Sequence, residues 1–165
     1  YRAMEQLSHK NYKQVVKSVE TSKEWPENLG VGKPYDNMID NRLEDYLEAK
    51  AAAGQGDSRK TSALLAAVAD YTISRSHFES GNLLSALALR ESGKVQEADH
   101  MVAAWSTDFP ENRVVQWCTA IYRGEKEKAV GMLQSRNDQT NTTPWEASFR
   151  DSNFDLIVRL FSTEQ

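Results

Sequence analysis

The chain has 165 residues, of which 39% are hydrophobic, a formal net charge of -4 and a mean hydropathy of -0.66. This length suits one domain, and the modest apolar content favours an elongated body over a sphere with one deep core. The acidic balance, without a long Lys/Arg cluster, argues against nucleic acid as a partner, and no apolar run is long enough for membrane insertion.

Apolar residues at helical spacing predict the first two helices, at residues 1–7 and 11–25. In the second of these, Tyr12, Val15 and Val19 recur on one face. The chain begins at Tyr1 and partway into a helix. We therefore expect it to be part of a longer protein.

The segment that follows, E-W-P-E-N-L-G-V-G-K-P-Y-D-N at residues 24–37, contains a G-V-G-K motif that a phosphate-binding loop could share. Such a loop needs a glycine five positions before Gly32, a Ser or Thr after the lysine, and a preceding strand. Here the residue five positions before Gly32 is Glu27, the residue after Lys33 is Pro34, and the preceding segment is a predicted helix. We interpret the segment as a loop between helices, and we expect no nucleotide or other cofactor.

The rest of the chain predicts further helices at residues 41–53, 58–71, 78–90, 95–105, 112–122 and 126–135. A last helix would start at Ser152 or Asn153, with Asp155 placed to complete its cap, and would present Phe154, Ile157, Leu160 and Phe161 on one side. Nothing alternates with period two for long enough to make a strand. The predicted fold class is all-α.

One pattern recurs between these helices: a glycine, a small residue five positions later, and a bulky apolar residue four further on. Glycine supplies a left-handed turn that closes one helix, and the small residue lets the next helix approach closely. Ala49, Ala86 and Ala88 are small residues where the paired helices would cross. The three copies, and a fourth with lysine in the glycine place, are Gly56–Thr61–Leu65, Gly93–Ala98–Val102, Gly124–Ala129–Leu133 and Lys10–Val15–Val19.

This pattern resembles the tetratricopeptide repeat. The copy at Gly93 matches best, with Ala86, Leu89, Gly93, Ala98, Val102 and Pro110 at the family's spacing. The other copies are degenerate, since the anchors Val15, Thr61, Ala98 and Ala129 are 46, 37 and 31 residues apart. The resemblance implies a right-handed α-solenoid of about four helical hairpins over residues 1–165, with residues 136–165 as a loop and a C-terminal capping helix.

A second resemblance is to the tail of a family of uncharacterised bacterial proteins. In that family a β-sandwich domain, similar to those of carbohydrate-active proteins, precedes degenerate tetratricopeptide repeats. The resemblance implies an amino-terminal partner domain and, loosely, carbohydrate metabolism, and it transfers no catalytic residue. It is carried by Trp25-Pro26-Glu27-Asn28-Leu29-Gly30, Gly32-Lys33, Asp45-Tyr46-Leu47, Pro144-Trp145-Glu146, Arg150-Asp151 and Phe154.

Catalytic and metal-binding patterns are weak. The carboxylates of Glu44, Asp45 and Glu48 fall at helical spacing, which is typical of a solvated face. The three histidines, His9, His77 and His100, are not spaced to place two ligands on adjacent turns of a helix. Cys118 could form a nucleophilic pair with a distant histidine, but a lone cysteine is more often a small buried residue. We expect no catalytic residue and no metal site.

The aromatic residues have two interpretations. Trp105, Trp117, Trp145, Tyr46 and Tyr122 could stack on a sugar or hold a peptide, or they could belong to the core. We favour the core for Trp105, where one hairpin would pack on the next, and for Trp145, where residues 144–161 would fold back on the fourth hairpin as a terminal cap. The candidate groove contacts lie on the first helices of the hairpins, which line the concave surface in this architecture: Tyr46, Lys50, Asn82 and Arg90.

The sequence therefore favours a non-enzymatic interaction module that packs against another protein or against its own amino-terminal domain. The alternative is an accessory helical domain of a carbohydrate-active or glycan-binding protein, in which the helices help to shape a glycan site. A standalone enzyme is the third interpretation. The sequence does not separate a periplasmic from a cytoplasmic bacterial location.

Overall fold

The computed structural model of the chain describes residues 1–24, 39–73, 78–138, 151 and 153–162. Within these ranges every regular element is a helix, which confirms the predicted all-α class for this part of the chain. The helices are α1 (Arg2–Ser8), α2 (Tyr12–Lys23), α3 (Arg42–Gly54), α4 (Ser58–Ile73), α5 (Gly81–Glu91), α6 (Val95–Asp108), α7 (Arg113–Tyr122), α8 (Lys126–Asp138) and α10 (Phe154–Ser162).

The predicted left-handed turns are confirmed. Gly56, Gly93 and Gly124 have φ angles of 80°, 82° and 75°, and Lys10 takes the same conformation at 56°. At each turn the N–H of the next residue donates to a carbonyl five residues back, as in the Schellman ending of a helix. These four bonds, of 2.8 to 2.9 Å, are Asn11 to Gln6, Asp57 to Ala52, Lys94 to Leu89 and Glu125 to Ala120. The same hydrogen-bonded left-handed turn therefore ends α1, α3, α5 and α7.

Small residues lie where the helices of a pair approach. Ala98 is fully buried at the start of α6, and Ala49, Ala86 and Ala88 are fully buried on α3 and α5. Thr61, in the equivalent place of α4, is partly exposed. A methyl side chain lets two helix backbones come close at these positions, so a larger side chain there would push the pair apart.

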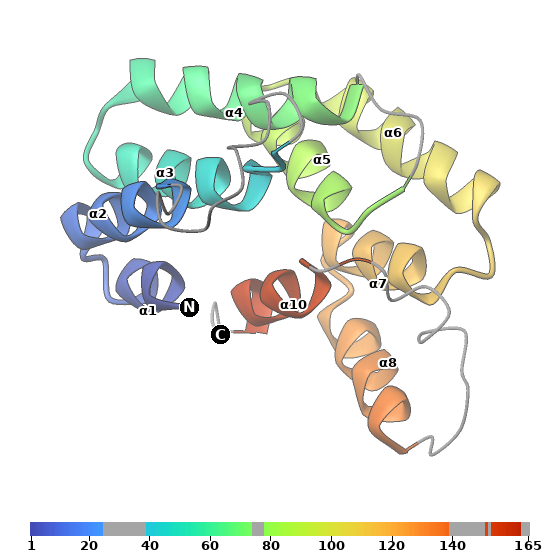
Figure 1. Cartoon of the computed structure of the whole chain (residues 1–165). Helices are drawn as coiled ribbons and strands as arrows, with labels where there is room; N and C mark the ends of the chain where they lie inside the picture. The colour runs from blue at the N-terminus through green and yellow to red at the C-terminus, as the bar shows by residue number, and fades with distance from the viewer. Residues whose placement is uncertain (25–38, 74–77, 139–150, 152, 163–165) are drawn as a thin grey trace, which may run out of the picture.

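The helix pairs follow one another along an arch (Figure 1). Each pair packs on the next through its second helix, as α2 does on α3 and α4 on α5. The first helices also touch in succession, α1 with α3, α3 with α5 and α5 with α7. Because α5 has neighbours on all sides, residues 81–89 are buried without a break.

The last helix, α10, lies inside the arch, between α1 and α7 (Figure 1). Its Phe154 ring packs edge-to-face on Trp117 of α7, with centroids 5.2 Å apart. Near its other end, the Arg159 guanidinium lies 4.5 Å from the centre of the Tyr1 ring. The helix therefore contacts the first residue of the chain and the first helix of the last pair.

This position differs from the expected cap on the fourth pair alone. Phe154, Ile157 and Leu160 are buried, and Leu156, Val158 and Phe161 are half-buried. At 100° per residue these side chains cover an arc of roughly 200°, which is wide for a surface helix. A helix with so broad an apolar surface needs neighbours on more than one side, and the end of one helix pair covers only one side. The part of the proposed cap at residues 144–150, with Trp145, lies outside the described residues.

One helix start was placed wrongly from the sequence. The pattern predicted a helix from Phe78, but α5 begins at Gly81. Phe78 instead packs edge-to-face on Trp105 of α6, with ring centroids 5.3 Å apart. Phe78 is apolar because it contacts another helix, although it lies before the start of α5. A periodic pattern cannot distinguish such a residue from one in the first turn of the helix.

Candidate functional site

Two of the predicted groove residues, Tyr46 and Lys50, converge on Glu91 at the end of α5. The Tyr46 hydroxyl donates to Glu91 Oε1 at 2.6 Å, and the Lys50 ammonium donates to the same oxygen at 3.2 Å. Lys50 Nζ also lies 5.6 Å from the centre of the Tyr46 ring. Tyr46 is only 3% exposed, so its ring is a packing surface within the chain.

The third predicted residue, Asn82, belongs to a buried polar cluster around Arg42. The Arg42 guanidinium donates to Asn82 Oδ1 at 2.6 Å, to Glu79 Oε2 at 2.7 Å and to both carboxylate oxygens of Asp40. It also lies 4.6 Å from the centre of the Tyr71 ring. Arg42 is 2% exposed, and its charge is compensated by two carboxylates.

Sequence reasoning missed Arg42 because an arginine in the first turn of a helix has no distinctive pattern. Gly81, at the start of α5, is the residue in the sequence that could have indicated the close packing around Arg42. A Cβ at Gly81 would lie 2.6 Å from the Arg42 guanidinium. A side chain at this position would therefore have to displace the guanidinium from its buried hydrogen bonds.

The fourth predicted residue, Arg90, has a different set of contacts. Its Nη1 donates to the carbonyl oxygen of Tyr122 at 2.8 Å, and its guanidinium lies 4.7 Å from the centre of the Tyr122 ring. The Tyr122 hydroxyl in turn donates to Asp99 at 2.7 Å. The four predicted residues thus have three separate sets of partners, and the described contacts do not unite them into one constellation.

A charged network joins α2, α3 and α4. Lys23 Nζ lies 2.6 Å from Asp45 and 3.1 Å from Glu48, and Lys60 Nζ lies 2.8 Å from the other oxygen of Glu48. Burial opposes ionisation of Glu48, but the hydrogen bonds from Lys60 and Lys23 outweigh it and lower the pKa of this carboxyl. An acid held ionised between two cations stabilises the fold and is poorly suited to proton transfer.

Catalytic groups do not come together in the described part of the chain. Burial, with the charge of Asp151, raises the pKa of the Cys118 thiol well above its usual range, so the thiol stays protonated and unreactive. Burial also raises the pKa of Glu44, but the described hydrogen bonds give this carboxyl no acid or base partner. No three His, Cys, Asp or Glu residues within the described ranges are grouped to hold a metal ion. Among the described helices, none has both the length and the apolar character needed to cross a bilayer.

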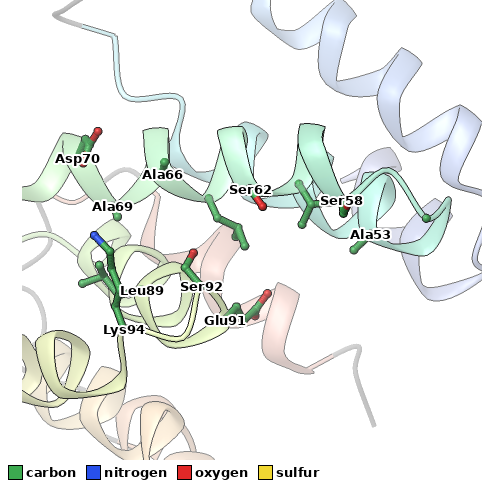
Figure 2. A pocket seen from close by; sticks show the side chains of 13 residues that line it. Ala53, Ser58, Ser62, Ala66, Ala69, Asp70, Leu89, Glu91, Ser92 and Lys94 are labelled. Carbon is green, nitrogen blue, oxygen red and sulfur yellow. The ribbon is translucent and has the colours of Figure 1, made fainter.

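A groove of about 500 Å³ runs between α4 and the turn from α5 to α6 (Figure 2). Its α4 wall is made mostly of small side chains, which keep it open. Its charged groups have both signs, so it has no clear preference for a cation or an anion. The labelled lining residues are Ala53, Ser58, Ser62, Ala66, Ala69, Asp70, Leu89, Glu91, Ser92 and Lys94.

A second hollow, of about 330 Å³, lies where α5, α7, α8 and the end of α10 meet. Its wall includes Leu87, Ile121, Leu133 and Phe161, and its charged residues are Arg90, Arg123 and Lys126. Trp117 also lines it and is buried. This hollow therefore combines an apolar interior with positive charge.

Comparison of the chain with known protein families, with curated proteins and with solved structures finds no match. The function must therefore be argued from the site geometry alone. The loop with the G-V-G-K motif, at residues 25–38, and Trp145 both lie outside the described residues.

Proposed function

We propose that the chain is a non-enzymatic protein-interaction module: a right-handed α-solenoid of about four tetratricopeptide-like hairpins that holds an amphipathic helix on its concave face. The observation that carries the proposal is the position of α10. This helix lies inside the arch, in contact with Trp117 near one end and with Tyr1 near the other. An inner face that accepts one amphipathic helix has the shape and the apolar character to accept another.

The contacts of α10 are those of a helix bound in a groove. Phe154, Ile157 and Leu160 recur every three residues and are at most 2% exposed. Asp155 and Arg159 are exposed on the opposite side. Asp151, just before the helix, accepts a hydrogen bond from the backbone N–H of Ser80 at the start of α5. Apolar anchors at helical spacing with one polar attachment are typical of helix-in-groove recognition.

Burial of four candidate aromatic residues argues against a glycan stacked at their positions. Sugar recognition by stacking needs exposed rings, but Tyr46, Trp105, Trp117 and Tyr122 are all between 1% and 7% exposed. The core interpretation of Trp105 is confirmed by this burial. The accessory role in a glycan-binding protein therefore has less support from the described residues than the protein-interaction role.

The test is whether α10 binds in trans. The protein is the full chain with Ile157→Ala and Leu160→Ala, which weakens the internal helix, and the ligand is a fluorescent peptide of residues 151–162. We expect saturable binding, measured by fluorescence anisotropy. The parent chain should bind the peptide much more weakly, because its own α10 competes at an effective concentration of the order of millimolar.

The matched control is a peptide of the same composition in which the apolar residues no longer share one face. It should not bind. If it binds as well as the native peptide, or if a folded double variant binds neither, the inner face does not recognise an amphipathic helix. Circular dichroism reports whether the variant is folded, and Leu160→Ala alone serves if the double variant unfolds.

A further inference from the structure

The hollow between α5, α7, α8 and α10 combines several features of a ligand site. Its volume of about 330 Å³ is at the lower end of the range for small-molecule pockets, roughly 300–1,000 Å³. Four helices contribute to its wall, and Leu87, Ile121, Leu133 and Phe161 make the wall apolar. It therefore has room for a small apolar group.

The described charged residues that line this hollow are all positive. They are Arg90, Arg123 and Lys126, with no described Asp or Glu in the lining, although the whole chain carries a net charge of -4. Tyr122 also lines it, and burial together with the hydrogen bond to Asp99 raises the pKa of this phenol to about 12, so it stays neutral at physiological pH. A local excess of positive charge on an acidic protein favours an anion.

Two carboxylates interact with residues that line the hollow or lie beside it. The hydrogen bond from Lys128, at 2.8 Å, and the charges of Lys128 and Arg123 lower the pKa of Glu125, and Asp99 accepts the hydroxyl of Tyr122. Arg90 is held against Tyr122, whereas Arg123 and Lys126 are exposed and have no ion pair with the described carboxylates. Two cations beside the hollow are thus available to an anionic ligand.

Trp117 supplies an independent observation. This residue lines the hollow and is 1% exposed, and its indole N–H has no hydrogen-bond partner among the described residues. Buried polar groups in proteins nearly always have a partner, so a buried donor without one calls for an explanation. The indole nitrogen itself has almost no accessible surface, so a ligand in the hollow would contact the Trp117 ring and not this N–H.

We propose that this hollow binds a small apolar carboxylate, whose apolar body contacts Leu87, Ile121, Leu133 and Phe161 and whose carboxylate lies near Arg123 and Lys126. A neutral apolar ligand would gain nothing from the positive charge of these two residues. A bare inorganic anion would leave the apolar wall in water. This inference does not depend on helix binding by the inner face.

A carboxylate on an apolar body can be a free organic acid or the last residue of a polypeptide, and the probes separate the two sources. Octanoate tests the free acid, with octan-1-ol as its neutral control. Acetyl-Gly-Leu with a free carboxylate tests the polypeptide end, with its amide as control. Binding of either acid supports the site, and the one that binds more tightly identifies the source.

The measurement is a titration of the full chain followed by the indole 1H–15N resonance of Trp117, assigned with Trp117→Phe. An acid should shift this resonance saturably, and its neutral control should not. Replacing Arg123 and Lys126 by Gln should weaken binding by about fivefold, a modest effect because both cations are exposed and screened. Lys13→Gln with Lys17→Gln, a charge-matched change at two exposed positions of α2, should leave the affinity unchanged.

Three outcomes would overturn the proposal. One is the absence of any shift with either acid. Another is equal binding of an acid and its neutral control, which would show that the charge is not recognised. The third is a double variant at Arg123 and Lys126 that binds as tightly as the parent, which would place the acid elsewhere.

Discussion

Arg42 and Asn82 lie 40 positions apart in the sequence and share a buried hydrogen bond of 2.6 Å, from Arg42 Nη1 to Asn82 Oδ1. The bond joins the start of α3 to the start of α5, which are the first helices of successive pairs. Because the Arg42 guanidinium also contacts Asp40 and Glu79, this cluster fixes how one pair is oriented on the next. The first predictions concern it.

Removing the Arg42 charge should destabilise the fold strongly. In Arg42→Met, Asp40, Glu79 and Asn82 lose a buried partner. Loss of one side of a fully buried ion pair costs about 3–5 kcal/mol, and the cost here should be smaller because the Asp40 and Glu79 side chains are 19% and 35% exposed. Urea unfolding followed by circular dichroism measures the free energy of unfolding. Lys50→Met is the control, because its pair with Glu91 is about one-third exposed and such pairs contribute about 0–1 kcal/mol. Equal losses in both variants would show that the Arg42 cluster has no special role.

Two glycine-to-alanine changes should have opposite signs. At Gly81, a new Cβ would lie 2.6 Å from the Arg42 guanidinium, so Gly81→Ala should destabilise the chain despite the better helix propensity of alanine. At Gly131, in the middle of α8, a Cβ would meet nothing within 4 Å. Gly131→Ala should therefore stabilise the chain by up to about 1 kcal/mol. Thermal melts of the two variants settle the comparison, and a higher melting temperature for Gly81→Ala would contradict the packing described here.

A large side chain should not fit at the crossing of α5 and α6. Ala98 is fully buried there, and Ala98→Leu should cost about 1–3 kcal/mol by overpacking. Ala103→Leu, on the same helix but at an exposed position, should change the stability by less than about 0.5 kcal/mol. Denaturant unfolding of both variants is the measurement. If Ala98→Leu matches the parent, the two helices do not cross at this residue.

The network of Lys23, Glu48 and Lys60 should make stability depend on acid pH. The pKa of Glu48 is lowered in the folded chain from its usual value of 4.5, so this group stabilises the fold above that value. The contribution is lost as the pH falls through the lowered pKa, because protonation removes the charge that the lysines hold.

Glu48→Gln should therefore be less stable than the parent at pH 7, and the difference should shrink progressively below about pH 4.5. Urea unfolding of both chains across the acid range gives this difference. Glu97→Gln is the control, since Glu97 lies 3.8 Å from Lys94 and both side chains are more than half exposed. A pH-independent difference for Glu48→Gln would mean that the charge of Glu48 does not contribute.

The local parts of the fold were predictable from the sequence. Gly56, Gly93 and Gly124 identified the turns because glycine alone adopts a positive φ at little cost. The same pattern predicted the left-handed turn at Lys10, where a side chain is present, from the residues that follow it. The ends of the helices depend on residues that are close together in the sequence. Most of the observed helix ends lie within three residues of the predicted ones.

The long-range parts were not predictable. The buried cluster of Arg42 depends on Asn82 and Glu79, which approach it only once α3 and α5 are packed. The apolar face of α10 was recognised, but its place inside the arch depends on surfaces contributed by helices far earlier in the chain. The hollow beside Trp117 was missed because its cations come from α5, from the turn after α7 and from the start of α8, and no single segment is basic.

The most direct test of the central claim is a set of nuclear Overhauser contacts across α10 in the labelled full chain. The claim is that α10 lies along the inner side of the arch, from α7 to the start of the chain. We expect contacts between the Phe154 and Trp117 rings and, in the same molecule, between the Arg159 side chain and the Tyr1 ring. Contacts to Trp117 without any to Tyr1 would place α10 as a cap on the last pair, and the inner face would then have no bound helix.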